Sequence, residues 1–191
     1  RKAGTIKANS SAVEGNREVV AKTIIAFGRI DALVCKAGTY PYGPIDEMTG
    51  AQIENIRNLN GRAVMVETME AVKHMKEGGR IIYIGSAFGA RAPFPGISLY
   101  AATKAALRGF AKGVARDLGS RGITANVIEP GPIHTDMNPE DGEGAALISS
   151  FVATGAYGTV EDFASLAAFL ASPKASYISG AALPVDGGLE A

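Results

Sequence analysis

The chain has 191 residues, of which 47% are hydrophobic, and its 19 basic residues balance 19 acidic ones. This length suits one domain with a substantial core, and zero net charge gives no electrostatic reason to expect nucleic acid or an acidic membrane as partner. No apolar run approaches the roughly 18 residues of a membrane span. The one cysteine, Cys35, excludes an intrachain disulfide and favours a reducing compartment, so a cytoplasmic protein is expected.

Short apolar runs alternate along the chain with longer amphipathic segments. Several of the runs have almost no polar alternation, which is typical of strands buried on both faces of a parallel sheet. The predicted strands are residues 5–9, 31–35, 80–85, 123–130 and 181–186. The predicted helices are residues 12–27, 46–76 (one long helix or a broken pair), 98–119 and 160–171. This alternation predicts one α/β domain, residues 1–191, with right-handed crossovers.

The segment 130–158 interrupts this rhythm with three prolines and five glycines. A stretch of this length without regular structure is typically functional rather than a plain connection. We therefore predict that residues 136–157 form a lid over a substrate site. Its apolar candidates for contact with a substrate are Met137, Leu147, Ile148, Phe151 and Tyr157.

Three polar residues point to proton-transfer chemistry. Ser86 follows a predicted strand, at the sheet edge where open α/β sheets bind ligands. Tyr100 and Lys104 are four residues apart and share a face of the next predicted helix. Tyrosine is a poor base at neutral pH because its usual pKa is about 10, and a nearby ammonium is expected to lower that value. General acid–base chemistry on a carbonyl or alcohol would then need a hydride partner, which implies a nicotinamide cofactor.

Five motifs in a fixed order reveal a resemblance that covers nearly the whole chain. They are "GRIDALVCKAG" (28–38), "GS" (85–86), "YAATK" (100–104), "GITANVIEPGPIHTDM" (122–137) and "GAALPVDGG" (180–188). Their order and spacing resemble the short-chain dehydrogenase/reductase family, and its bacterial 3-oxoacyl-carrier-protein-reductase-like members most of all. The resemblance implies a Rossmann-like, doubly wound parallel sheet, NAD(P)(H) as cofactor, and hydride transfer between a ketone and a secondary alcohol. It also implies a homodimer or homotetramer.

The resemblance assigns a role to individual residues. Tyr100 would be the catalytic acid or base, Lys104 would tune it and hold the nicotinamide ribose, and Ser86 would orient the substrate oxygen. In "NLNG", Asn58 would be the fourth catalytic residue, and Asn60 is given no role. No metal is implied. The residues implied in cofactor binding are Asn9, Ser10, Cys35, Ala37, Gly38, Tyr100, Lys104, Pro130, Gly131, Ile133 and Thr135.

Two features depart from the family pattern. Cys35 and Lys36 stand where the family has two asparagines, which alters the hydrogen-bond network after that strand and adds a cation near the cofactor. No glycine-rich phosphate loop follows a strand, so the first β-α-β unit is expected to be missing from this chain and to belong to a longer protein. The strand over residues 5–9 would then lack its neighbours, and the choice between NAD and NADP stays open.

Three hypotheses about function follow. The first is an NAD(P)-dependent oxidoreductase acting on a modest, mostly apolar alcohol or ketone, which suits the few charges of the lid. The second is a degenerate, non-catalytic nucleotide-binding or regulatory protein that keeps the fold. The third is a chain that serves mainly as a subunit interface, against which the complete set of Ser86, Tyr100 and Lys104 argues.

Overall fold

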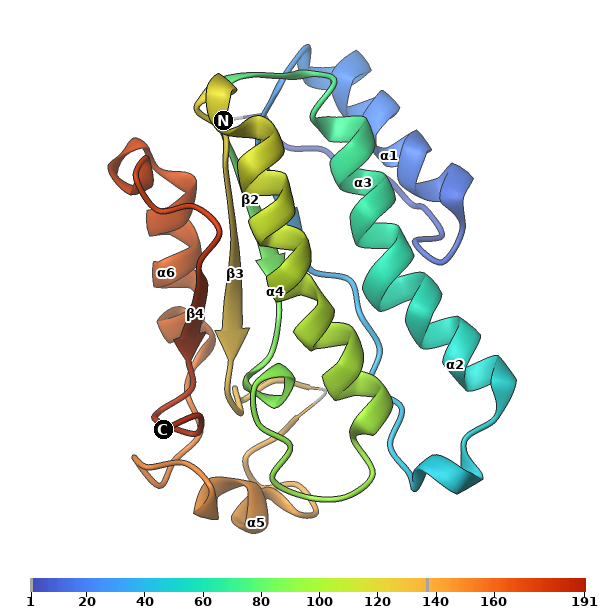
Figure 1. The fold of residues 1–191 in the computed structure, drawn as a ribbon, viewed down its shortest axis with the longest axis vertical. Helices are drawn as coiled ribbons and strands as arrows, with labels where there is room; N and C mark the ends of the chain where they lie inside the picture. The colour runs from blue at the N-terminus through green and yellow to red at the C-terminus, as the bar shows by residue number, and fades with distance from the viewer. Residues whose placement is uncertain (1, 137) are drawn as a thin grey trace.

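A parallel sheet forms the centre of the protein in the computed structural model, which describes residues 2–136 and 138–191. Its strands are β1 (Ile30–Cys35), β2 (Met75–Ile84), β3 (Thr124–Pro130) and β4 (Ala182–Val185), paired in the order β1-β2-β3-β4 (Figure 1). In β2 the stretch from Gly79 to Tyr83, and nearly all of β3, are buried, as expected of strands covered on both faces. The four strands predicted from residue 31 onward are confirmed.

Helices cover both faces of this sheet. One face packs against α1 (Val13–Phe27), α3 (Ala63–Ala71) and α4 (Ser98–Leu118), and α4 crosses in front of the strands in Figure 1. The other face packs against α6 (Val160–Ala171), whose Leu170 lies with Ile82 and Ile128 in a separate apolar cluster. The doubly wound α/β architecture is therefore confirmed.

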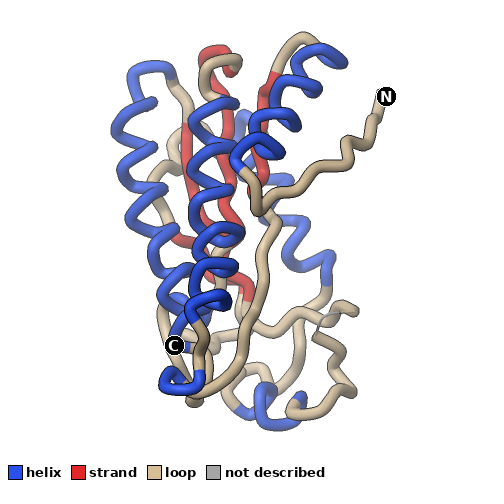
Figure 2. Tube along the Cα trace, turned by 90° about the vertical axis from the view of Figure 1, so that its right-hand side faces the viewer, coloured by secondary structure: helices blue, strands red, loops and turns tan. Residues whose placement is uncertain are grey.

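The N-terminal segment is not the predicted strand. Residues 2–9 run as an extended loop beside α1, with the Lys2 ammonium donating to the Ala26 carbonyl at 2.9 Å (Figure 2). Extended backbone becomes a strand only where a neighbour takes up its hydrogen bonds. Among the described residues β1 pairs only with β2, so residues 5–9 find no partner there.

Of the region predicted as one long or broken helix over residues 46–76, residues 50–71 are continuously helical, but their middle is wound differently, and residues 75–76 already belong to β2. A capping box of Thr49 and Gln52 starts α2 (Gly50–Ile56), a π-helical turn follows at Arg57–Arg62, and α3 ends at Ala71. A π-helical turn inserts extra backbone into a helix and is often found at functional sites. Here it carries the buried side chain of Asn60.

A buried ion pair fixes α4 to the sheet. The Arg108 guanidinium donates two hydrogen bonds, of 2.6 and 2.7 Å, to the carboxylate of Glu129, which is fully buried in β3. Arg108 also donates to Glu190 at 3.1 Å. Because both Glu129 oxygens are paired, its charge is compensated inside the core. This contact sets the position of the helix that carries Tyr100 and Lys104.

The remaining elements are short. Within the segment predicted as a lid, α5 (Ala145–Ser150) is the one helix among the described residues. Met137, which was predicted to contribute to the lid, lies outside the residues that the structure describes. In the described part of the chain, every helix is too short or too polar to cross a membrane.

Candidate active site

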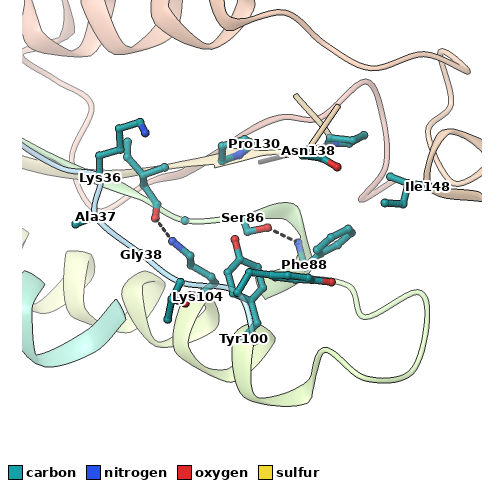
Figure 3. Close-up of a pocket in the computed structure, with 16 residues that line it drawn as sticks. Lys36, Ala37, Gly38, Ser86, Phe88, Tyr100, Lys104, Pro130, Asn138 and Ile148 are labelled. Atoms are coloured by element: carbon teal, nitrogen blue, oxygen red, sulfur yellow. Dashed lines mark hydrogen bonds between the residues drawn. The ribbon is translucent and has the colours of Figure 1, made fainter. Parts of the chain in front are cut away.

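A cavity of about 440 Å³ opens at the carboxyl ends of β1, β2 and β3 (Figure 3). Residues 36–40 follow β1, residues 84–86 end β2, and residues 130–132 end β3. From the covering elements come Phe88, Tyr100, Lys104, Asn138 and Ile148. This is the edge where open α/β sheets bind ligands, as predicted from the position of Ser86.

Two glycines fix the position of Ser86 because they let the backbone on either side of it pack closely against its neighbours. A side chain at Gly85 would meet a methyl group of Val127 at 2.6 Å, and one at Gly89 would meet the backbone nitrogen of Ala105 at 2.9 Å. The turn Ala87–Gly89 therefore lies directly on α4. The Ser86 hydroxyl oxygen accepts a hydrogen bond of 3.1 Å from the Phe88 backbone, so its own proton remains available for another acceptor.

Lys104 is a buried ammonium in the wall of this cavity. Its Nζ donates to the Ile84 carbonyl at 2.8 Å, which is the only hydrogen bond that it makes with the described residues. Burial, aided by the nearby charge of Lys36, lowers the pKa of Lys104 to about 8. An ammonium has three N–H donors, so two remain for a ligand.

Tyr100 lies one helical turn before this lysine. The Lys104 Nζ lies over the Tyr100 ring, 5.6 Å from its centroid. The expectation that the ammonium lowers the tyrosine pKa is wrong for the free protein. Burial raises the pKa of Tyr100 because it disfavours the phenolate, and the hydroxyl of Ser86 opposes that effect only in part.

Asn60, rather than Asn58, makes hydrogen bonds to the segment after β1 and to α4. The Asn60 amide donates to the Thr39 carbonyl at 2.9 Å and to the Thr103 hydroxyl at 3.2 Å, while its oxygen accepts from the Thr39 backbone at 2.8 Å. Asn58 is only half-buried, and its buried side-chain oxygen has no hydrogen-bond partner among the described residues. The catalytic role of Asn58 stays a prediction, and the hydrogen bonds favour Asn60 over it. No local pattern singled out Asn60, because it lies in a π-helical turn, where the usual spacing of 3.6 residues does not apply.

The residues predicted to bind the cofactor divide into two groups. Ala37, Gly38, Tyr100, Lys104, Pro130 and Gly131 line the cavity. Cys35 is buried behind the lining, and burial raises the pKa of its thiol. Asn9 and Ser10 lie in the turn just before α1, where the Asn9 side chain accepts from the Ser11 backbone. Ile133 and Thr135 lie just beyond the lining, in short bridges to Gly158 and Asn138.

The groups that line the cavity fit a nicotinamide ribose. A Cβ at Gly38 would lie 3.3 Å from Asn60 Oδ1 and 3.6 Å from Lys104 Nζ, so the missing side chain leaves open the space beside these polar atoms. The spare N–H donors of Lys104 point to a partner with oxygen acceptors, which ribose hydroxyls supply. Lys36, which replaces an asparagine of the family pattern, adds a second cation to the lining.

Sequence reasoning missed other parts of the lining. Tyr40 and Phe88 each lie two residues beyond a residue that was assigned to the site, and both stand near the carboxyl end of a strand. Their position near the end of a strand could therefore have identified them as lining residues. Asn138 offered none, because a polar residue in a proline-rich segment is usual.

Comparison with known proteins identifies the family of this chain. Residues 2–190 match the family model described as enoyl-(acyl carrier protein) reductase. The chain is 41% identical, over 90% of its length and 73% of the relative, to the cyclic-di-GMP-binding biofilm dispersal mediator protein of Escherichia coli.

Two solved structures are closely similar. A short-chain dehydrogenase/reductase from Serratia marcescens is 44% identical with a TM-score of 0.96, and 97% of this chain covers 76% of that one. A short-chain dehydrogenase from Burkholderia cenocepacia, solved with NADP, is 45% identical with a TM-score of 0.96 and the same coverage. The chain therefore spans about three quarters of the length of these relatives, and it belongs to the short-chain dehydrogenase/reductase family of NAD(P)-dependent oxidoreductases.

Proposed function

We propose that the protein interconverts a ketone and a secondary alcohol, with Tyr100 as the acid and base at the substrate oxygen. The observation that carries this proposal is the gathering of Ser86, Tyr100 and Lys104 around one cavity at the carboxyl edge of the sheet. The Burkholderia cenocepacia relative was solved with NADP, so NADP(H) is the first cofactor to test, followed by NAD(H).

The cofactor would lie against the part of the cavity formed by Ala37, Gly38, Lys104, Pro130 and Gly131. When bound, its nicotinamide would supply a hydride to the carbonyl carbon or accept one from the carbinol carbon. Lys104 would donate its free N–H groups to ribose hydroxyls, which compensates part of the cost of keeping an ammonium buried.

The substrate oxygen would receive two hydrogen bonds from the protein. The Ser86 hydroxyl accepts from the Phe88 backbone, and its free proton would be donated to the substrate oxygen. A tyrosine is ordinarily protonated at neutral pH, and burial raises the pKa of Tyr100 further, so it can serve as the acid that protonates the alkoxide in ketone reduction. The Lys104 ammonium would then stabilise the phenolate that remains.

Asn60 would act as a positioning residue. Its amide binds both the N–H and the carbonyl of Thr39 and the hydroxyl of Thr103 on α4. These three hydrogen bonds link the segment after β1 to the helix that carries Tyr100 and Lys104. Asn60 therefore helps to set the width of the cavity between the segment after β1 and α4.

Removal of the Tyr100 hydroxyl tests the proposal. Tyr100→Phe is expected to lower ketone reduction by roughly 100-fold or more, the range for loss of a general acid. NADPH affinity, measured by fluorescence titration, should stay within about twofold of the original, because the ring remains in place. Tyr177→Phe, at a fully exposed tyrosine, is the matched control. Unchanged turnover in Tyr100→Phe would contradict the assignment.

A second candidate is a nucleotide-binding protein without catalysis. It is favoured by Lys36, a cation in the lining where the family has an asparagine, and by the Escherichia coli relative, whose name describes binding of cyclic-di-GMP. The same titrations discriminate between the two. Tight binding of a nucleotide without turnover of any ketone or secondary alcohol would favour this candidate over the enzyme.

We further propose a cytoplasmic homodimer or homotetramer that acts on a small molecule, without nucleic acid or membrane as partner. The buried free thiol of Cys35 supports a reducing compartment. Met65 and Met69 lie exposed on α3, and such apolar exposure is compatible with a subunit interface. Light scattering of the purified protein measures the assembly directly, and a monomeric mass would contradict it.

A further inference from the structure

We propose that the preferred substrate is an uncharged ketone with one aromatic ring next to the carbonyl, and that Tyr40 and Phe88 select it. The inference rests on the proposed ketone reduction and names its substrate class. It follows from the way in which charges and aromatic rings divide the cavity.

Charge is confined to one end of the cavity. Lys36 and Lys104 lie toward the segment after β1, whereas Phe88 and Ile148 lie toward the opposite end (Figure 3). The described lining includes no carboxylate, and its other polar side chains are neutral. A charged group on the part of the substrate that lies near Phe88 and Ile148 would therefore find no counter-charge, and its desolvation would oppose binding.

Tyr40 presents an aromatic surface beside the proposed acid. Its ring meets the Tyr100 ring edge-on, with centroids 4.7 Å apart and planes at 77°. The Tyr42 ring stacks with the Tyr40 ring, with centroids 6.4 Å apart. Tyr42 in turn packs against Gly96, where a Cβ would lie 2.8 Å from its ring. Burial and the neighbouring tyrosines raise the pKa of Tyr40 to about 12, so the ring is uncharged at working pH.

Phe88 presents a second ring close to the hydroxyl of Ser86, two residues earlier. It meets Phe94 edge-on at 5.3 Å and 82°, and Phe94 stacks with Phe151 at 6.0 Å. This aromatic row is anchored on a small buried cluster that includes Val152 and Leu189. The Phe88 ring is therefore held before any ligand arrives, which lowers the entropy cost of binding.

An aromatic substrate gains more here than a saturated one of the same size. Rings that pack edge-on or offset gain about 0.5–1.5 kcal/mol beyond the burial of their area. The carbonyl oxygen of the substrate would lie at Ser86 and Tyr100. In a conjugated ketone the aromatic ring is coplanar with the carbonyl, so it would lie near the rings of Tyr40 and Phe88. The cavity is at the small end of the roughly 300–1,000 Å³ range of ligand sites and must also admit the nicotinamide, which favours a single ring.

The test compares acetophenone with cyclohexyl methyl ketone, which differ in the aromaticity of a ring of similar size. Conjugation alters the intrinsic reactivity of the carbonyl, so the decisive quantity is the change in the ratio of their kcat/KM values between protein variants. Tyr40→Leu and Phe88→Leu are each expected to lower the acetophenone preference by roughly 2- to 10-fold. Tyr40→Phe, which keeps the ring, should leave the ratio unchanged.

Phe169→Leu, at an exposed aromatic on α6, is the matched control. A charged analogue, 4-acetylbenzoate, should be a poorer substrate than acetophenone. Tyr100-dependent turnover with the same ratio in all variants would overturn the substrate class and leave the proposed function standing. Absence of turnover with every ketone would overturn both.

Discussion

The buried charge of Lys104 lowers the free energy of unfolding by an amount that can be measured. Its usual pKa of 10.5 falls to about 8 in the folded protein. At 1.36 kcal/mol per pH unit, that difference corresponds to about 3 kcal/mol by which folding disfavours the ammonium. Lys104→Met keeps most of the side-chain volume and removes the charge. It also leaves the Ile84 carbonyl without its donor, which costs about 1–2 kcal/mol. At pH 7 the variant should therefore be about 1–2 kcal/mol more stable.

This gain depends on pH in a defined direction. Because the folded-state pKa lies below the unfolded-state value, the unfolded protein binds more protons than the folded protein between pH 8 and pH 10.5. The free energy of unfolding of the unmodified protein therefore rises with pH across that window. By pH 9.5 about 2 kcal/mol of the cost should have disappeared, and with it the advantage of Lys104→Met.

Urea denaturation followed by circular dichroism at pH 7 and pH 9.5 measures both values. Lys112→Met, which removes an exposed lysine from the same helix, is the control and should behave alike at the two pH values. The reasoning is refuted if the stability difference between Lys104→Met and the unmodified protein does not change with pH.

Three further changes probe other features of the site. Lys36→Met should raise the pKa of Lys104 and move any loss of activity at alkaline pH upward, visible in the pH profile of kcat/KM. Asn60→Leu breaks three hydrogen bonds and should reduce kcat strongly, whereas Asn58→Leu should change it by less than about twofold; equal effects in steady-state assays would contradict the assignment. Arg108→Met leaves the buried carboxylate of Glu129 without its cation and should lower the free energy of unfolding, measured by urea denaturation, by about 3–5 kcal/mol.

Local patterns predicted much of this site because the chemistry sits on regular elements. Ser86 was found from the end of an apolar strand, and Tyr100 and Lys104 were found from helical spacing. Both rules depend on backbone geometry alone, so they hold wherever the element forms. The structure agrees, with all three residues lining one cavity.

The features that local patterns did not reveal depend on contacts between distant parts of the chain. The raised pKa of Tyr100 follows from burial, to which the Tyr40 ring contributes from another segment. The segment over residues 5–9 has a strand-like pattern, but pairing needs a neighbour that no local pattern reveals. Asn60 lies in a π-helical turn, where the usual spacing of 3.6 residues does not apply.

That π-helical turn limits how far the protein can be made more robust. Gly61 lies within it and has open space around its Cα, so Gly61→Ala looks like a simple route to a firmer helix. A turn that relaxed to ordinary α-helical winding would swing the neighbouring Asn60 away from Thr39. Selection for heat resistance and selection for turnover would then act against each other at this one turn. An evolved thermostable variant is expected to gain its stability elsewhere and to leave these six residues irregular.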